Sequence, residues 1–158
     1  MYFPLLRQSR LRSCGNRFTP SFHLDLITTR VGLGVICSSP IPKRAFVVEY
    51  AGELLLDKDA MTRPNRRYQV QMKAKAIWDD STVFIDAAEC ENESRFINHS
   101  CRPNCALYER QRTNGSRLGV FAETDIPPLQ ELTFRYSEKI LTLFTFQCGD
   151  KNCISNNQ

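Results

Sequence analysis

Cysteine and histidine supply the most reactive side chains of this sequence, which contains 7 Cys and 2 His among 158 residues. The number of cysteines is odd, and their density is far below that of a small scaffold held together by disulfides. Free thiols, or thiolate ligands of a metal, in a reducing compartment fit this usage better. Secretion is therefore not expected.

His99 lies in a dense polar segment, residues 98–104, with the sequence Asn-His-Ser-Cys-Arg-Pro-Asn. Two apolar residues, Phe96 and Ile97, come directly before it, which is an unusual beginning for a surface loop. We therefore expect the segment to be partly buried. A single His is more often a hydrogen-bonded core or loop residue than a catalytic group. The residue types alone leave both interpretations of His99 open.

Short stretches of alternating apolar and polar residues surround this segment, separated by Gly, Pro, Asn and Asp. A period of two predicts half-buried strands. The predicted strands cover residues 22–27, 34–37, 46–50, 68–72, 83–86, 105–108, 119–122 and 132–136. Helical spacing is weak, and it predicts one short helix at 57–62, before Pro64, and a turn of helix around 94–98. The pattern therefore predicts a mainly β fold with few short helices.

Composition and charge exclude several classes of protein. With 42% hydrophobic and 24% charged residues, the chain is typical of a globular domain with a substantial core. The 21 Lys and Arg exceed the 17 Asp and Glu by a net charge of +4, which is too small to argue for direct DNA binding. No apolar run approaches the roughly 20 residues of a membrane-spanning helix. We expect no membrane partner.

The N-terminal segment is basic, with Arg7, Arg10, Arg12 and Arg17 before the first acidic residue, Asp25. Its apolar residues come before its charges, which is the reverse of a signal peptide. A solvated or chromatin-facing arm and a mitochondrial transit peptide both fit this composition.

The stretch 95–104, Arg-Phe-Ile-Asn-His-Ser-Cys-Arg-Pro-Asn, resembles the signature of SET-domain protein lysine methyltransferases almost residue for residue. Three further matches occur in the family's order: Gly-Leu-Gly at 32–34, Glu-Tyr-Ala-Gly-Glu at 49–53 and Glu-Leu-Thr-Phe-Arg-Tyr at 131–136. The resemblance implies several small β-sheets around a knot-like crossing, where the Asn-His segment threads beneath the strand that carries the final Tyr.

The resemblance also implies a division of the chain. Residues 1–19 resemble the end of a pre-SET region, residues 20–137 the SET domain, and residues 138–158 a post-SET tail. In the family's post-SET segment, three tail cysteines and the Cys of the Asn-His-Ser-Cys block hold one zinc. Cys101, Cys148 and Cys153 match this pattern, whereas Phe146 occupies the position of the first tail cysteine. The implied zinc site is incomplete, and ordinary free thiols are the alternative.

The reaction implied by the resemblance is methyl transfer from S-adenosylmethionine to a protein lysine. Tyr136 would be the principal catalytic tyrosine, and Tyr50 and Tyr68 would line the lysine channel or the cofactor pocket. Phe134 occupies the position that sets how many methyl groups are added, and Phe there implies di- or trimethyl-lysine. The residues implied to hold the cofactor are Gly32, Leu33, Gly34, Tyr68, Arg95, Asn98 and His99.

Three positions depart from the family's pattern. Arg135 precedes the last Tyr, where family members often carry an acid. Leu33 replaces an aromatic residue, and Glu91 replaces a Gly. These departures favour an alternative hypothesis, a catalytically impaired SET module that binds chromatin. The intact Tyr136, Asn98 and His99 favour an enzyme.

The implied substrate is a histone tail, foremost that of histone H3, in the nucleus on the chromosome. The resemblance is strongest to enzymes that modify lysine nine or lysine thirty-six of that histone, and a non-histone protein is the alternative. No sequence-specific contact with nucleic acid is implied. A small zinc-dependent nucleic-acid module would need complete Cys/His quartets and a strong basic face, and the sequence has neither.

Overall fold

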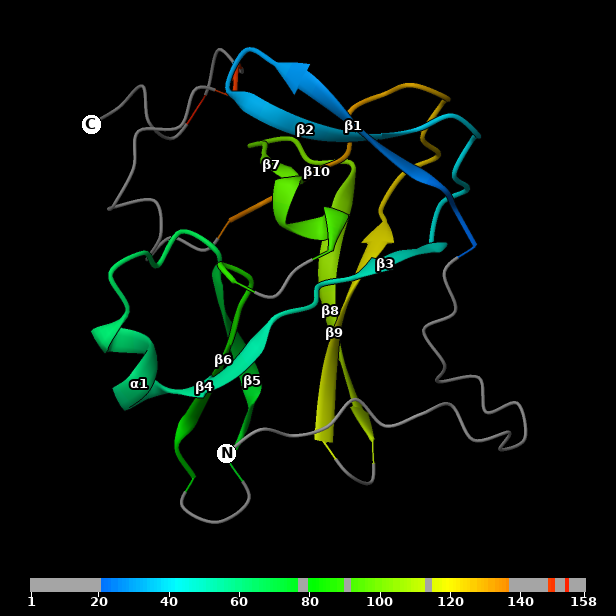
Figure 1. Cartoon of the computed structure of the whole chain (residues 1–158). Helices are drawn as coiled ribbons and strands as arrows, with labels where there is room; N and C mark the ends of the chain where they lie inside the picture. Colours follow the sequence, from blue (N-terminus) through cyan, green and yellow to red (C-terminus); the bar gives the residue numbers. More distant parts are fainter. Residues whose placement is uncertain are drawn as a thin grey trace.

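Strands dominate the computed structural model, which describes residues 21–76, 80–89, 92–112, 115–136, 148–149 and 153 (Figure 1). In these residues the chain forms several small sheets, two of them with two strands and two with three strands. The mainly β fold predicted from the alternating pattern is confirmed. The expected N-terminal segment, residues 1–19, lies outside the described residues.

One three-stranded sheet has the order β3 (Phe46–Glu49), β9 (Gly115–Ala122), β8 (Cys105–Arg112), and both of its pairs are antiparallel. The β8–β9 hairpin is longer than predicted. Its backbone pairing continues through charged residues such as Glu109 and Arg117, where the alternation of apolar residues has ended.

The other three-stranded sheet has the order β4 (Glu53–Leu56), β6 (Thr82–Asp86), β5 (Gln69–Lys75). Strand β4 was not predicted, because a run of three leucines does not alternate, and Leu54 remains 63% exposed at this edge. Helix α1 (Asp57–Thr62) follows β4 directly and has the predicted bounds.

The two small sheets bring distant segments of the chain together. Strands β1 (Leu24–Thr29) and β2 (Gly32–Cys37) form an antiparallel hairpin. Strand β7 (Asn98–His99) pairs in parallel with β10 (Thr133–Phe134). The predicted turn of helix is shorter than expected, because the 3-10 helix η1 (Glu93–Phe96) ends before Ile97 and the chain then becomes the strand β7.

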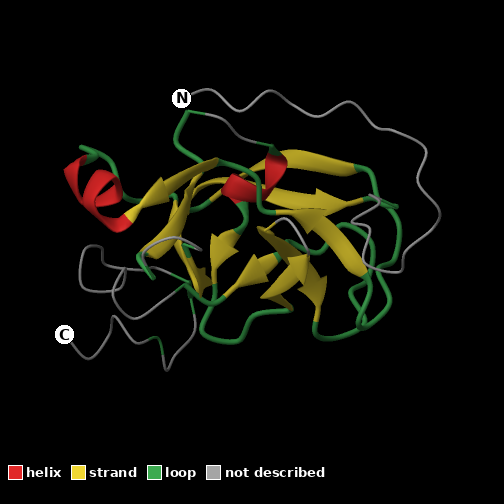
Figure 2. Ribbon diagram, turned by 90° about the horizontal axis from the view of Figure 1, so that it is seen from below, coloured by secondary structure: helices red, strands yellow, loops and turns green. Residues whose placement is uncertain are grey.

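Side chains from all parts of this arrangement meet in one core. Five of these side chains are 0% exposed. They are Val35 of β2, Val47 of β3, Val120 of β9, Ile97 directly before β7 and Leu132 directly before β10. Ile97 therefore anchors the polar segment that follows it, which explains why His99 is buried. Figure 2 shows α1 at the margin of the molecule and the 3-10 helix among the strands. Among the described residues, no helix has the length and apolarity needed to span a bilayer.

Candidate active site

The parallel pairing of β7 with β10 places Asn98 opposite Thr133 and His99 opposite Phe134. His99 Nδ1 accepts a hydrogen bond of 3.1 Å from the backbone N–H of Tyr136, and the two rings pack edge to face with centroids 5.4 Å apart. Burial, with the nearby Arg135 guanidinium, lowers the pKa of His99. A neutral imidazole thus fixes the backbone that carries Tyr136.

Three aromatic rings form a continuous cluster beside this strand pair. The ring centroids of Phe134 lie 6.3 Å from Tyr50 and 5.1 Å from Tyr136. Tyr50 and Phe134 are only 3% and 4% exposed. The cluster thus brings together the three residues for which the resemblance predicts catalytic roles. Phe134 lies in β10, Tyr136 is the second residue after β10, and Tyr50 directly follows β3.

Both tyrosine hydroxyls of this cluster donate to backbone carbonyls. Tyr136 Oη donates to the carbonyl of Ile97 at 2.9 Å, and Tyr50 Oη donates to that of Tyr68 at 2.9 Å. A phenol has one proton, so toward any other group each oxygen can act only as an acceptor. Burial, with a smaller contribution from Tyr68, raises the pKa of Tyr136 to about 12, and burial also raises the pKa of Tyr50. Both phenols keep their protons at neutral pH.

Arg95 contacts Tyr68, whose carbonyl binds the Tyr50 hydroxyl of this cluster. Its guanidinium carbon lies 4.2 Å from the ring centroid of Tyr68, which is the geometry of a cation–π contact, and its Nη1 donates to the carbonyl of Ala88 at 3.0 Å. Because the carbonyl of Tyr68 in turn accepts from Tyr50, Arg95 stabilises one wall of the site. The buried Asp86, for which the sequence predicts no role, adds to the effect of burial in raising the pKa of Tyr50.

The Gly-Leu-Gly segment of β2 lies beside Asn98. Asn98 Nδ2 donates to the carbonyl of Leu33 at 2.9 Å and to Glu131 Oε1 at 2.8 Å. Gly32 has φ of +120° and open space where a Cβ would stand, whereas a Cβ on Gly34 would lie 2.5 Å from Thr29 Cγ2. Gly34 is thus required by packing within the protein, and Gly32 by its backbone conformation.

Two residues of the site were quoted in the sequence motifs but given no role. Asn104 is 8% exposed; its Nδ2 donates to the carbonyl of Glu131 at 2.8 Å, and its Oδ1 accepts from the N–H of Thr133 at 2.8 Å. Glu131 uses its carboxylate on Asn98. Only their places in the motifs could have indicated that these two residues belong to the site, because their hydrogen-bond partners are far away in the sequence.

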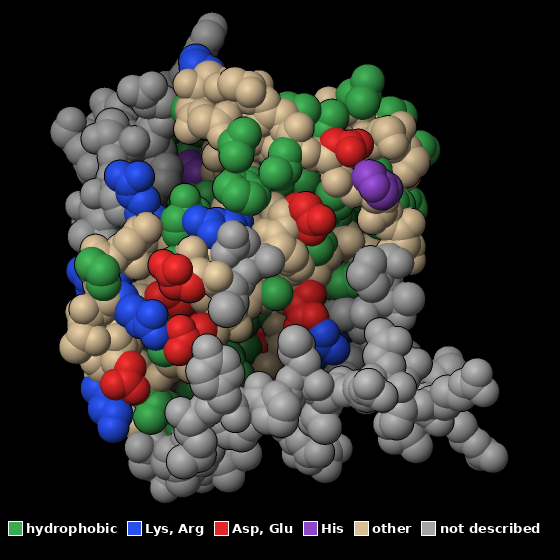
Figure 3. Space-filling view, in the orientation of Figure 1, with side chains coloured by type: hydrophobic (Ala, Val, Ile, Leu, Met, Phe, Trp, Pro, Cys, Tyr) green, Lys and Arg blue, Asp and Glu red, His purple; other side chains and the backbone are tan. Residues whose placement is uncertain are grey.

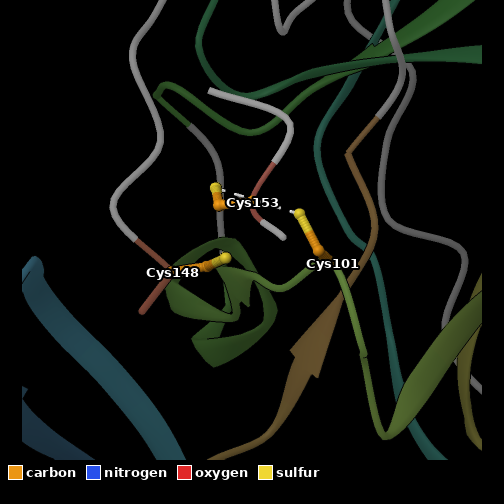
Figure 4. A group of neighbouring side chains, drawn as sticks. All are labelled: Cys101, Cys148 and Cys153. Carbon is orange, nitrogen blue, oxygen red and sulfur yellow. Dashed lines mark hydrogen bonds between the residues drawn. The ribbon is translucent and has the colours of Figure 1, made fainter. Parts of the chain in front are cut away.

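Cys101, Cys148 and Cys153, which we call the cysteine cluster, meet next to the same strand pair (Figure 4). Their Sγ atoms all lie within 4.8 Å of one another, and those of Cys101 and Cys153 are 3.9 Å apart. These distances are compatible with ligands that share one metal ion. The chain positions of Phe146 and Glu91 lie outside the described residues.

The cysteine cluster is linked to the tyrosine site in two ways. His99 Nε2 lies 3.5 Å from the Sγ of Cys101, while Nδ1 of the same ring accepts from Tyr136. The exposed Arg135, where the sequence departs from the family, donates to the backbone carbonyl of Cys101. Its side chain therefore stabilises the loop that carries this cysteine.

Charges on the outer surface are mixed in sign. On the face shown in Figure 3, Lys and Arg side chains lie among Asp and Glu side chains. Arg63 and Glu53, for example, form an ion pair of 2.7 Å beside α1. A pair this exposed contributes little to stability.

The fold and the site are those of a known class of protein domain, the SET domain. The chain is a member of this family, because the family's sequence model matches residues 32–137. The crystal structure of Arabidopsis thaliana SUVH6 in complex with SAM superimposes with a TM-score of 0.65 at 33% sequence identity, covering 75% of this chain and 28% of that one. The family and the fold inferred from the motifs are thereby confirmed.

Two proteins whose names state an enzymatic activity are similar in sequence to most of this chain. Histone-lysine N-methyltransferase ASHR3 of Arabidopsis thaliana is 36% identical over 145 residues, which is 89% of this chain and 29% of that protein. An H3 lysine-36 specific histone-lysine N-methyltransferase of Mycosarcoma maydis is 32% identical over 139 residues, 83% of this chain and 14% of that protein. The chain thus spans only a minor part of the length of either relative.

Proposed function

We propose that this chain transfers methyl groups from S-adenosylmethionine to the side-chain amine of a protein lysine. The observation that carries the proposal is the meeting of Tyr136, Phe134 and Tyr50 with the strand Asn98–His99. The similarity to histone-lysine N-methyltransferases supports it. The reaction needs a site that excludes water, accepts the sulfonium cation, and aligns the lysine amine with the methyl group.

The residues beside Asn98 fit S-adenosylmethionine, a nucleoside with a sulfonium centre and an amino acid end, which supplies the methyl group when bound. The lowered pKa of His99 keeps its ring uncharged, so it does not repel the sulfonium cation. The amide oxygen of Asn98 can accept a hydrogen bond from a polar group, and the neighbouring residues Gly32 and Leu33 are exposed. The residues that would hold this cofactor are Gly32, Leu33, Gly34, Tyr68, Arg95, Asn98 and His99.

The lysine amine must lose its proton before it can attack. At pH 7 this costs about 4.6 kcal/mol for a lysine of ordinary pKa. The cluster of Tyr50, Phe134 and Tyr136 is buried or half-buried, and its phenols stay protonated, so it offers the ammonium neither water nor a phenolate. Such surroundings lower the pKa of an amine.

The two phenol oxygens would align the transfer. Because the protons of Tyr136 and Tyr50 are donated to the carbonyls of Ile97 and Tyr68, the oxygens present lone pairs to their other neighbours. Lone pairs attract the hydrogens of a polarised methyl group through weak C–H···O contacts. Holding donor and acceptor nearly collinear then contributes to the rate enhancement.

Phe134 would set the number of methyl groups. It packs edge to face against Tyr50, at an interplanar angle of 87°, and it has no hydroxyl to hold a water in the space beside the amine. A methylated amine could then rotate into line for a second or third transfer. We propose di- or trimethyl-lysine as the product.

The cysteine cluster would hold one zinc through three thiolates. Sulfur ligands suit this ion, and the distances among the three Sγ atoms fit a shared site. The Nε2 of His99 beside Cys101 would then act as a neighbour of a bound thiolate and stiffen the ring that holds Tyr136. We therefore propose that residues 20–137 form the SET domain and residues 138–158 a post-SET-like tail, to which Cys148 and Cys153 belong.

The substrate we propose is the histone H3 tail on chromatin, in the nucleus. The name of the Mycosarcoma maydis relative favours lysine thirty-six of that histone. The test is incubation with labelled S-adenosylmethionine and reconstituted nucleosomes, followed by mass spectrometry of the tails, beside the Tyr136→Phe protein. Methylated H3 is the expected product. Cofactor binding without transfer to any histone or other protein would favour an impaired chromatin-binding module, and absence of cofactor binding would refute the proposal.

A further inference from the structure

We propose that Glu131 is a positioning residue that fixes the carboxamide of Asn98 with its oxygen toward the cofactor, and so selects ligands that carry an amino group. This rests on the proposed function, because it concerns the same cofactor site. The sequence motifs predict no role for Glu131.

A carboxamide has two N–H donors on its nitrogen and an oxygen that only accepts. In Asn98 the nitrogen faces two groups that can only accept, the carbonyl of Leu33 at 2.9 Å and the Oε1 of Glu131 at 2.8 Å. Rotating the amide by half a turn would direct its oxygen at both of these oxygens. The network therefore fixes which atom is nitrogen and which is oxygen.

Glu131 is itself held firmly. Its backbone carbonyl accepts from Asn104 Nδ2 at 2.8 Å, and the next residue, Leu132, donates its N–H to the carbonyl of Val35 at 2.8 Å. Its carboxylate lies over Gly34, where a Cβ would come within 2.7 Å of Oε1. Backbone pairing and close packing thus keep the carboxylate at the amide.

The consequence is a rule for the ligand. With both N–H groups directed at the protein, Asn98 can offer a ligand only its oxygen, which is a hydrogen-bond acceptor. The complementary group is a donor, and the amino group at the amino acid end of S-adenosylmethionine is an ammonium with three donors. A nucleoside without that end cannot benefit from the orientation of Asn98.

Calorimetric titration with three ligands tests this rule without measuring turnover. The ligands are S-adenosylhomocysteine, its analogue with hydrogen in place of the amino group, and 5′-methylthioadenosine, which lacks the whole amino acid. The unchanged protein should bind the first more tightly than the second. In Glu131→Ala the affinity for S-adenosylhomocysteine should fall about tenfold, the usual effect of a hydrogen bond to a charged group. Affinity for the other two ligands should stay within about twofold.

Two further variants separate orientation from charge. Glu131→Gln keeps an oxygen that can accept from Asn98, so it should bind S-adenosylhomocysteine nearly as the unchanged protein does. Glu131→Asp keeps the charge but is one methylene too short to reach the amide, so it should behave like Glu131→Ala and replaces it if the alanine protein does not fold. Glu53→Ala, at the exposed ion pair with Arg63, is the matched control and should change nothing.

The outcomes are distinguishable. If Glu131→Ala or Glu131→Asp weakens all three ligands equally, Glu131 only supports the structure and the inference is wrong. If Glu131→Gln behaves like Glu131→Ala, the carboxylate acts by its charge and the inference is also wrong. If the unchanged protein binds neither S-adenosylhomocysteine nor 5′-methylthioadenosine, the proposed cofactor itself is refuted, and this inference with it.

Discussion

Replacing Tyr136 by Phe separates the chemical role of the hydroxyl from the packing role of the ring. The hydroxyl donates to the carbonyl of Ile97, a residue that is 0% exposed, at 2.9 Å. Loss of this donor from a buried carbonyl should cost about 2 kcal/mol of stability. For a domain of this size, that is a fall in Tm of about 4 to 8 °C.

The effect on turnover should be much larger than the effect on cofactor binding. Loss of one preorganised polar group from an active site typically reduces kcat by about 100- to 1,000-fold. Binding of S-adenosylhomocysteine should change by less than about threefold, because the bond from the Tyr136 backbone to His99 at 3.1 Å does not involve the hydroxyl. Single-turnover assays would measure the chemical step, and calorimetry would measure binding.

Tyr108→Phe is the matched control, because Tyr108 is 50% exposed and donates its hydroxyl to Glu123 on the surface. It should leave both turnover and cofactor binding unchanged. Near-normal turnover in Tyr136→Phe would refute the role of the hydroxyl. A parallel loss of turnover and of cofactor affinity would instead mean that the substitution disturbs the whole site.

Phe134→Tyr should shift the products toward monomethyl-lysine at similar total turnover, since a hydroxyl there can hold water in the space that a methylated amine needs. If the unchanged protein produces only monomethyl-lysine, this prediction is wrong. The cysteine cluster should bind zinc weakly, because protons compete for its thiolates, so the zinc-to-protein ratio after dialysis against a mild chelator should be well below one. A ratio near one would mean that a further ligand completes the site. Stability should fall as the pH rises from about 10 to about 12, because the unfolded chain releases the proton of Tyr136 near its ordinary pKa of 10.0, whereas the folded protein keeps it until about 12. In urea unfolding, Tyr136→Phe should lose less stability than the unchanged protein over this range, and equal losses would refute the assignment.

Local patterns in the sequence determine several elements of this protein. The helix at 57–62 ends before Pro64, and the alternating residues of β3, β6 and β9 became strands, because these signals depend on neighbours in the sequence. The signature from Arg95 to Asn104, together with the motifs at 32–34, 49–53 and 131–136, identified the family and most of the predicted site residues.

The tertiary structure decided how those residues work. Asn98 and Leu33 are 65 positions apart, and Asn98 and Glu131 are 33 apart, yet one amide bonds to both. Strand β7 is only two residues long, and it exists because β10 pairs with it. Hydrogen bonds between distant segments depend on which backbones the whole fold brings together, and no periodicity in the sequence records them. The motifs therefore predict which residues form the site, and only the tertiary structure decided the orientation of Asn98 and the burial that keeps the proton on Tyr136.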